Sequence, residues 1–532
     1  MAITTTARTL LSLRPSTLLS RSYASSSLRT ARASSRRRPL SPEPERVLFQ
    51  SLGCPRNLVD TEVMMGVTTE HGLVPTNELA HADYVVVNTC GFLESAREES
   101  NEAIREFLQT KPPNTKVIVT GCMVNLHQHQ IYQDFPQVDS ILGSGKIDQI
   151  VETIESLRAQ EDERTRQHAL EQELLQDQQP NDNPSVSTAS AARRRRKSFL
   201  ESGDTPRFLS TPPHFAYLKI AEGCKKQCAF CIIPKIKGRL RSKPIDQIVQ
   251  EYTSLLEASP MLSEVILIAQ DLGDYGKDFV QPLPQSHLTN LLCALLDATD
   301  TLPDESRQHN MWIRLLYLYP DEITPDLLNL LEEDPRICRY LDMPIQHSHN
   351  DMLKLMRRKT STDDIRRTIR SLRQRLPDVH IRTSLMVGFP GETEEHFQHL
   401  LDFVREEQLD NVGVFTYSDE PMAYSSKLPN HVPEDIKQDR YHRLMEAQYE
   451  IVQQKNDARV GEHLDVVVEG LNGDGQVVGR YYGQCPDIDG QVILSTSTNA
   501  GEETAIQAGK RYTVQVTGHA DFDLVGEIVE TD

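Results

Sequence analysis

The sequence predicts an α/β protein with three folded domains: an open α/β domain, a central partial barrel of six βα units, and a small antiparallel β-barrel. Three observations support this prediction. The chain has 532 residues, too many for one ordinary domain. Short apolar runs alternate with helical patterns from about residue 45 to 446, as is typical of parallel sheets. Beyond residue 457, short strands with glycine turns favour a small barrel.

Residues 1–44 are expected to be a transit peptide or a disordered segment. Residues 1–40 contain eight Arg and fifteen Ser or Thr, and the first acidic residue is Glu43. A basic, hydroxyl-rich segment without acidic residues is typical of organellar targeting. We therefore expect the protein in an organellar matrix, mitochondrial rather than plastid. The alternative is a disordered basic tail on a cytoplasmic protein. No run of about 18 apolar residues occurs, which argues against a membrane-spanning helix.

Residues 45–157 are predicted to form the open α/β domain. Three apolar strand candidates occur there, and each runs directly into a cysteine. The strands are residues 47–54, 83–90 and 116–122, and the cysteines are Cys54, Cys90 and Cys122. Open parallel sheets bind their ligands at the carboxyl edge of the strands. Because all three thiols arrive at that edge, we expect them to form a functional site.

Residues 158–213 are predicted to be a helix that gives way to a disordered, charged linker. The segment is polar, low in complexity and nearly free of aromatic residues. Its basic run, Arg193 to Lys197, is interpreted as a solvated charge cluster, with a nucleic-acid or localisation patch as the alternative.

Residues 214–446 are predicted to form a partial (βα)6 TIM-like barrel, with its functional groups at the carboxyl ends of the strands. The six strand candidates are residues 215–220, 265–271, 311–319, 340–346, 380–388 and 411–418. The groups at their ends are the Cys224 loop, Gln270–Asp271, Tyr319–Pro320, Gln346–His347, the Gly388–Gly391 turn and Tyr417–Ser418.

The first of these loops carries Cys224, Cys228 and Cys231 with the spacing C-x3-C-x2-C. Thiolates are soft ligands that select zinc, copper or iron–sulfur clusters. Zinc would need a fourth ligand, and the next candidates in sequence are distant: Cys293, Cys338 and His347. Three thiolates on a four-iron cluster would instead leave one iron open to a small molecule.

This loop resembles that of the radical S-adenosylmethionine (SAM) family, including the aromatic residue, Phe230, before the third cysteine. Most of the chain resembles the methylthiotransferases, which join a three-cysteine domain, a radical-SAM barrel and a TRAM barrel. Within that family the likeness is to the RimO-type branch, which modifies an aspartate of ribosomal protein S12. The segments that carry it are residues 51–62, 85–104, 219–238, 340–358 and 387–397.

The resemblance implies two [4Fe-4S] clusters and SAM as cofactors. The cluster on Cys224, Cys228 and Cys231 would bind SAM and cleave it reductively to a 5′-deoxyadenosyl radical. A second open cluster, on Cys54, Cys90 and Cys122, would hold the sulfur or methylthio group to be transferred, and a second SAM would supply the methyl. The implied product is an S12 aspartate methylthiolated at its β-carbon, and the implied partners include an electron donor and a sulfur donor.

Further site residues are predicted with alternatives. The expected cofactor-binding residues are Phe230, Gln270, Asp271, Gly388, Gly391 and Arg382, and Gln346 is a candidate catalytic residue. Gln270 and Asp271 either hydrogen-bond SAM or cap a strand end, and the two glycines either admit the cofactor or form a tight turn. Arg382 and Gln346 are candidates for the SAM carboxylate or the substrate. The stretch 415–425 departs from the family pattern, so nothing is carried over from it. Cys293, Cys338 and Cys485 are expected to be packing or surface residues.

The charge of the chain favours a protein substrate over RNA. The formal net charge is −20, and residues 457–532 hold four Lys or Arg against fourteen Asp or Glu. A module that grips RNA should be basic, whereas an acidic one attracts a cationic protein. Direct nucleic-acid binding is therefore not expected. Two alternatives remain: a tRNA adenosine methylthiotransferase and a non-catalytic scaffold that binds zinc or a cluster.

Overall fold

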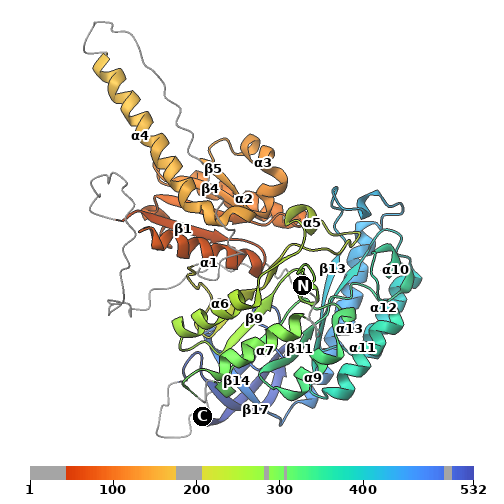
Figure 1. The fold of residues 1–532 in the computed structure, drawn as a ribbon. Coiled ribbons are helices and arrows are strands. Elements are labelled where there is room, and N and C mark those ends of the chain that lie inside the picture. The colour runs from red at the N-terminus through yellow and green to blue at the C-terminus, as the bar shows by residue number, and fades with distance from the viewer. Residues whose placement is uncertain (1–43, 175–205, 281–286, 305–307, 496–505, 532) are drawn as a thin grey trace. The chain divides into compact units, whose positions relative to one another are not determined.

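The computed structural model describes residues 44–174, 206–280, 287–304, 308–495 and 506–531, all within one compact unit, Pro44–Asp532 (Figure 1). Most of the expected targeting segment (residues 1–43) and the basic run Arg193–Lys197 lie outside the described residues. No helix among the described residues is long and apolar enough to cross a membrane.

The N-terminal domain is a five-stranded parallel sheet in the order β2-β1-β3-β4-β5. Its strands are β1 (Arg46–Ser51), β2 (Val74–Thr76), β3 (Tyr84–Thr89), β4 (Lys116–Gly121) and β5 (Ser140–Gly143). Its helices are α1 (Pro55–Glu70), η1 (Leu79–His81), α2 (Glu94–Thr110), α3 (Cys122–Asp134), η2 (Ser144–Gln149) and α4 (Ile150–Leu174). The prediction of an open α/β domain is confirmed, and the two edge strands that it omitted are only three and four residues long.

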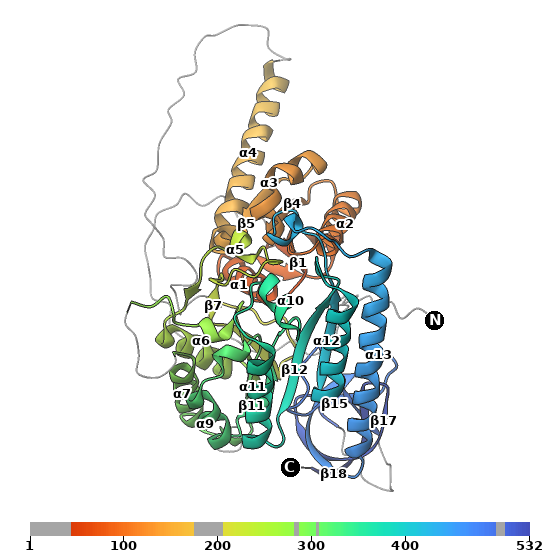
Figure 2. The same ribbon diagram turned by 90° about the vertical axis from the view of Figure 1, so that its right-hand side faces the viewer.

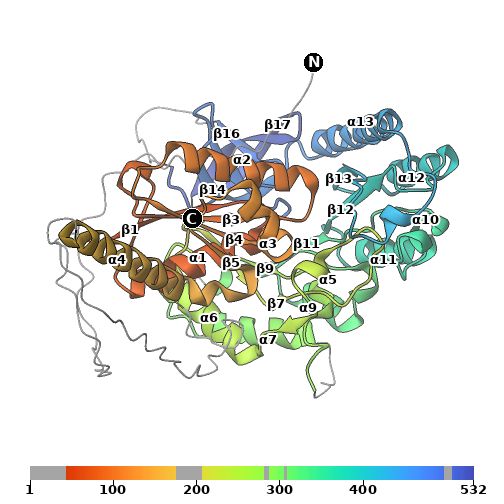
Figure 3. The ribbon, with the colours of Figure 1, turned by 90° about the horizontal axis from the view of Figure 1, so that it is seen from above.

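Two apolar layers enclose this sheet. Val86 and Ile118 face one layer with side chains of α1 and α4, while Val85 and Val119 face the other with side chains of α2 and α3. Figure 3 shows α2 on one side of the sheet and α1 and α4 on the other. Every residue of the central strand β3 is buried, because helices cover both of its faces.

The segment 158–213 agrees with the predicted helix at its first described end and differs from the predicted linker at its second. At the first end, α4 continues as far as Leu174. At the second, Arg207 donates hydrogen bonds from Nη2 and Nε to the Glu62 carboxylate of α1 (2.6 and 2.9 Å), and the Ser210 hydroxyl donates to the same carboxylate (2.8 Å). Residues near 207–210 are therefore anchored to the N-terminal domain, through a carboxylate that is fully buried.

The central domain is a six-stranded parallel sheet in the order β13-β12-β11-β10-β9-β6, which confirms the partial barrel. The strands are β6 (Phe215–Lys219), β9 (Glu264–Ile268), β10 (Trp312–Leu315), β11 (Ile337–Asp342), β12 (His380–Val387) and β13 (Asn411–Thr416). The helices are α5 (Ile233–Ile236), α6 (Ile245–Ala258), α7 (His287–Asp300), α9 (Pro325–Glu333), α10 (Asn350–Leu355), α11 (Thr362–Arg375), α12 (Glu394–Glu407) and α13 (Glu434–Ala458). A short hairpin, β7 (Ala221–Glu222) with β8 (Arg241–Ser242), flanks the cysteine loop, and three 3-10 turns are η4 (Leu272–Asp274), η5 (Pro320–Glu322) and η6 (Ser425–Lys427).

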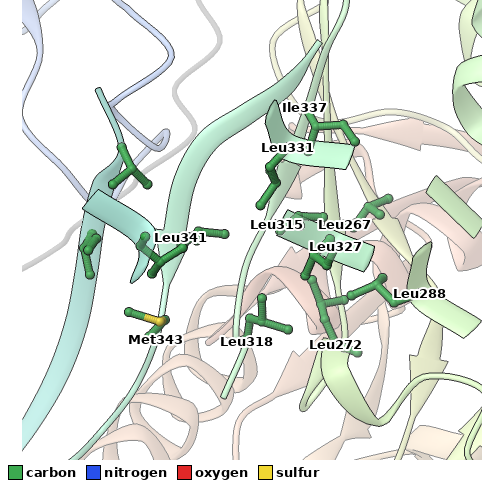
Figure 4. Close-up of a cluster of buried hydrophobic side chains, with 14 of the residues drawn as sticks. Leu267, Leu272, Leu288, Leu315, Leu318, Leu327, Leu331, Ile337, Leu341 and Met343 are labelled. Carbon is green, nitrogen blue, oxygen red and sulfur yellow. The ribbon is translucent and has the colours of Figure 1, made fainter. Parts of the chain in front are cut away.

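The outer helices α11, α12 and α13 run along the sheet, as Figure 2 shows. The core between sheet and helices is mostly Leu, Ile and Val. Leu267, Leu315 and Leu341 point from three strands toward Leu288, Leu327 and neighbouring side chains (Figure 4). This apolar layer fixes the sheet, so the polar loops at the strand ends are free to carry chemistry.

The C-terminal domain is a closed five-stranded barrel, in the order β14-β15-β16-β18-β17. Its strands are β14 (His463–Leu471), β15 (Val477–Arg480), β16 (Val492–Ser495), β17 (Arg511–Ala520) and β18 (Asp523–Thr531). The barrel was expected to be antiparallel, and this is wrong at one place: β16 pairs with β18 in parallel. An odd number of strands cannot alternate in direction around a closed ring, so one parallel pair is unavoidable.

Candidate active site

The first three cysteines lie at the same edge of the N-terminal sheet. Cys54 is the N-cap of α1, Cys90 follows β3, and Cys122 is the first residue of α3. The loops are in contact, because a Cβ placed on Gly53 would lie 2.7 Å from the Cys90 Cβ. Gly53 also has a φ of +87°, so the turn needs glycine for its backbone as well as for space. We call Cys54, Cys90 and Cys122 the first triad.

Asn57, in the first turn of α1, joins the three loops of the first triad. Its Nδ2 donates to the carbonyl oxygens of Leu52 (3.0 Å) and Thr89 (3.1 Å), each two residues or fewer from a cysteine of the triad. Its Oδ1 accepts a hydrogen bond from the Cys122 thiol at 3.5 Å. One buried amide therefore sets the spacing of all three loops.

The thiols of the first triad have different pKa values. Burial raises the pKa of Cys54, but Arg56, the Asn57 N–H and Lys237 outweigh it, and the net pKa is lowered. Burial raises the pKa of Cys122 to about 12, and it also raises that of Cys90. The site thus favours one thiolate, and a bound metal is needed to deprotonate the others.

Cys224, Cys228 and Cys231, which we call the second triad, lie in the loop between β7 and α5. Each sulfur has one hydrogen-bond partner: the Lys226 N–H for Cys224 (3.4 Å), the Tyr319 hydroxyl for Cys228 (3.6 Å) and the Ile233 N–H for Cys231 (3.4 Å). Burial raises the pKa of Cys224 to about 11 and that of Cys231 to about 12. Three thiols within eight residues, each with a hydrogen-bond partner at its sulfur, fit an iron–sulfur cluster, because thiolates are the ligands that such clusters use.

A buried network of charges connects the two triads. The Lys219 ammonium group binds Asp60 of α1 and Glu222 (2.8 Å to Glu222), and Lys237 binds the same two carboxylates at 3.3 and 3.2 Å. The two lysines hold the pKa of Glu222 well below its usual range despite burial, and the carboxylates raise the pKa of Lys237. Two ammonium groups and two carboxylates therefore compensate one another within the protein.

Further contacts come from residues adjacent to the first triad. The Arg56 guanidinium donates to the Ala269 carbonyl at the end of β9 (2.6 Å) and lies 5.2 Å from the Tyr317 ring. The Asn125 amide of α3 donates to the Ile236 carbonyl of α5 (2.8 Å). Helices that begin at the first triad thus contact the strand ends and the helix beside the second triad.

Asp271, which follows β9, lies close enough to Cys224 to act on the thiol electrostatically. Asp271 accepts from the Gly273 N–H (3.0 Å) and lies 3.2 Å from the Lys226 ammonium group. Burial raises the pKa of Asp271 to about 7, although Lys226 opposes the increase. Gln270 donates to Glu222 (3.4 Å), and its Oε1 has no hydrogen-bond partner among the described residues. Gln270 therefore retains an acceptor for a ligand, whereas Asp271 also serves as a cap.

The glycines after β12 have different roles. Gly388 (φ +76°) has its N–H bonded to Glu392, and a Cβ there would lie 2.2 Å from the Lys437 Cγ. The close approach at Gly388 is thus made by α13, which supports the tight turn rather than cofactor access. At Gly391 (φ +87°) a Cβ would meet only Leu355, at 3.5 Å.

Gln346 and Phe230 lie near the strand ends. Gln346 has a φ of +70°, held by hydrogen bonds with the backbones of Ser384 (2.9 Å) and Met386 (2.7 Å). A non-glycine residue with its backbone in this left-handed region is uncommon, and it marks a position where the surroundings enforce strain. Phe230 packs against a buried cluster that includes Met352 and Phe389.

Arg382 does not join this group, contrary to the prediction. It is the third residue of the eight-residue strand β12, about 20 Å along the strand from Gly388. Its guanidinium binds Asp342 (2.8 Å) and lies 3.7 Å from Asp489 of the C-terminal barrel. Two carboxylates therefore compensate its charge within the protein.

Several residues near the triads were not singled out from the sequence. Arg56, Asn57, Asp60 and Lys237 stand in the segments that carry the family resemblance, but only their contacts reveal their roles. The remaining cysteines match expectation, since Cys338 and Cys485 are buried in the protein core and Cys293 lies on α7.

Comparison with known proteins agrees with this architecture. Family models match residues 46–143 (uncharacterized protein family UPF0004), 218–404 (radical SAM superfamily) and 460–529 (TRAM domain). The ribosomal protein uS12 methylthiotransferase RimO of Protochlamydia amoebophila is 46% identical over 92% of this chain and 93% of its own length. The chain belongs to the RimO family.

Other members and one solved structure are also similar. The RimO protein of Chlamydia felis is 41% identical over 91% of this chain and 95% of its own length. The radical SAM methyltransferase TsrM of Kitasatospora setae has a TM-score of 0.48 at 16% identity, covering 72% of this chain and 77% of its own.

Proposed function

We propose that this chain is a radical-SAM methylthiotransferase that adds a methylthio group to the β-carbon of an aspartate in ribosomal protein uS12. The observation that carries the proposal is the pair of cysteine triads, which share one set of interdomain contacts through α1, α3 and α5. Transfer of a sulfur-containing group to an unactivated carbon needs both a radical source and a sulfur carrier. Two triads, each with one ligand position left open, provide a place for each.

Cys224, Cys228 and Cys231 would hold the [4Fe-4S] cluster that cleaves SAM. That cluster supplies the reductive cleavage, which gives access to a C–H bond that no side-chain base can deprotonate. Around it, the free Oε1 of Gln270 can accept from the amino group of SAM. Lys226 keeps the Asp271 carboxylate compensated beside the loop.

Cys54, Cys90 and Cys122 would hold the second [4Fe-4S] cluster and with it the sulfur to be transferred. Asn57 fixes the three loops, so the thiols are held in place before a cluster binds. Arg56 and Lys237 lower the pKa of Cys54, and their charges compensate thiolates in a buried site. An unidentified sulfur donor and electron donor complete the reaction.

The charge of the C-terminal barrel supports a cationic protein substrate. Of its few basic residues, Arg480 is buried and bonded to Glu264 (2.8 Å) and Glu469 (2.5 Å). Arg511 lies 3.9 Å from the Trp312 ring and donates to the Asn310 carbonyl. These cations are used inside the protein, so they add little to a surface for RNA phosphates.

The test is the intact mass of uS12 with and without the enzyme, SAM and a reductant under anaerobic conditions. The proposal predicts a gain of one sulfur and one CH2, lost in Cys224→Ala and in Cys54→Ala and kept in the control Cys293→Ser. An unchanged uS12 mass together with new methylthio-adenosine in tRNA would favour the tRNA alternative. Absence of both products and of SAM cleavage, despite bound metal, would favour the scaffold.

The composition of residues 1–40 supports a second proposal, that this segment directs the protein to the mitochondrial matrix. Its eight Arg and lack of acidic residues are typical of such a signal. A fluorescent fusion of residues 1–44 should enter mitochondria. Entry into plastids, or retention in the cytoplasm, would contradict the proposal.

A further inference from the structure

The sulfurs of the second triad differ in where their hydrogen bonds originate. Cys224 and Cys231 each accept from the backbone N–H two residues further along the chain, at 3.4 Å. Cys228 instead pairs with the side chain of Tyr319, which follows β10 and is 91 residues away (3.6 Å). A cysteine that ligates iron has lost its proton, so the Tyr319 hydroxyl must then be the donor.

Two cations flank the Tyr319 ring. The Arg358 guanidinium carbon lies 4.3 Å from the ring centroid and the Lys226 ammonium nitrogen 4.8 Å from it. Arg358 donates from Nη2 to the Pro344 carbonyl (3.0 Å), while its Nε and Nη1 have no hydrogen-bond partner in the described part of the chain. The described residues also include no carboxylate in an ion pair with Arg358, so its charge acts on the ring and on the sulfur beyond it.

We propose that Tyr319 is a positioning residue that tunes the reduction potential of the SAM-cleaving cluster, by donating a hydrogen bond to the Cys228 sulfur with Arg358 behind its ring. This inference depends on the proposed function, because it requires a cluster on the second triad. Hydrogen bonds to the ligating sulfurs help set the potential of an iron–sulfur cluster. Reduction adds negative charge, so a donor and a nearby cation stabilise the reduced form more than the oxidised form and raise the potential.

Tyr319 and Arg358 can each be changed without altering the loop that bears the cysteines. Tyr319→Phe removes the hydroxyl and keeps the ring, while Arg358→Gln removes the charge and keeps the hydroxyl. Tyr252→Phe is the matched control, because it removes another buried hydroxyl of the same domain, which bonds from α6 to Thr299 of α7 (2.7 Å).

The experiment is an anaerobic redox titration followed by electron paramagnetic resonance. The background is Cys54→Ala, Cys90→Ala and Cys122→Ala combined, so that the second triad alone holds iron. At the potential where half of the parent clusters are reduced, Tyr319→Phe should lower the reduced-to-oxidised ratio by about threefold or more, where tenfold corresponds to 59 mV for a one-electron couple. Arg358→Gln should lower the reduced-to-oxidised ratio as well, and Tyr252→Phe should leave that ratio unchanged. SAM cleavage by Tyr319→Phe should be slow with a weak reductant and recover with a stronger one.

The outcomes separate this inference from the proposed function. If the parent background loads no iron and cleaves no SAM, the proposed function fails and the inference fails with it. If the parent loads and Tyr319→Phe has an unchanged or higher potential, only the inference is wrong. Loss of iron from Tyr319→Phe alone, or an equal shift in Tyr252→Phe, would also overturn it, because Tyr319 would then serve assembly or general packing.

Discussion

Each triad offers three cysteine thiols as ligands, but the two triads depend on the fold in different ways. The first triad is assembled from three strand ends spread over residues 54–122, and a single amide, Asn57, spaces its loops. The second lies within residues 224–231, and two of its three sulfur contacts are local backbone N–H groups. A site assembled from distant segments is vulnerable wherever the fold is altered, whereas a local loop is vulnerable mainly in its own residues.

The largest expected effect separates the two triads by their chemistry. Cys224→Ala should abolish both the methylthio gain on uS12 and the formation of 5′-deoxyadenosine from SAM. Cys54→Ala should abolish the methylthio gain but retain SAM cleavage, because the second triad is intact. Chromatographic measurement of 5′-deoxyadenosine beside uS12 intact mass gives both readouts. Equal loss of cleavage in the two variants would mean that the triads do not have separate roles.

Asn57→Asp should disrupt the first triad while sparing the second. The carboxylate keeps the shape of the amide but loses two donated hydrogen bonds and repels the Leu52 and Thr89 carbonyls. Each unsatisfied buried group costs about 1–3 kcal/mol. Iron should fall from about eight per chain, the content of two four-iron clusters, to about four. The control Asn329→Asp, where an exposed Oδ1 accepts from Arg375, should keep full iron. Full iron in Asn57→Asp would show that the loops are spaced by other contacts.

Asp60→Asn tests the charge network that connects the triads. The change leaves Lys219 and Lys237 with Glu222 alone in a buried setting. Breaking a buried pair in this way costs about 3–5 kcal/mol, measured by denaturant unfolding of the iron-free protein. Glu161→Gln, which breaks the exposed contact with Lys116, is the control and should leave the unfolding midpoint almost unchanged, because solvent screens that pair. If both variants lost similarly little unfolding free energy, the result would argue against a structural role for the charge network.

The smallest expected effect is a difference in thiol reactivity in the iron-free protein. The lowered pKa of Cys54 makes it the more nucleophilic thiol at neutral pH, whereas the pKa of Cys122 is raised to about 12. Brief alkylation followed by peptide mass mapping should therefore label Cys54 before Cys122, and the two should label equally in denaturant. The difference in labelling rate between Cys54 and Cys122 should become smaller as the pH rises. Faster labelling of Cys122 would contradict the electrostatic account.

Most of the architecture could be predicted from the sequence, because most of the strands stand out as apolar runs between helical patterns. All six barrel strands and the three central strands of the first sheet were recognisable as buried apolar runs. The edge strand β2, with only three residues and a proline, carries no such signal. The parallel pairing of β16 with β18 follows from closing the C-terminal barrel, which a strand-by-strand reading does not capture.

The candidate site was predictable where its signal is local and not where it depends on tertiary contacts. The spacing of Cys224, Cys228 and Cys231 is visible directly in the sequence. Tyr319 is 91 residues from Cys228, and Arg56 is 213 residues from Ala269, so those contacts need the folded chain. Arg382 was misplaced because its contacts with Asp342 and Asp489 are tertiary, and the sequence of β12 does not reveal them.

The central claim, that each triad holds its own four-iron cluster, is tested most directly by counting iron and sulfide per chain in three anaerobically reconstituted proteins. The parent should bind about eight irons, and a variant with either triad changed to alanine should bind about four. The spectrum of the parent should equal the sum of the two variants. A parent with about four irons, or a triad variant that keeps all of its iron, would contradict the account.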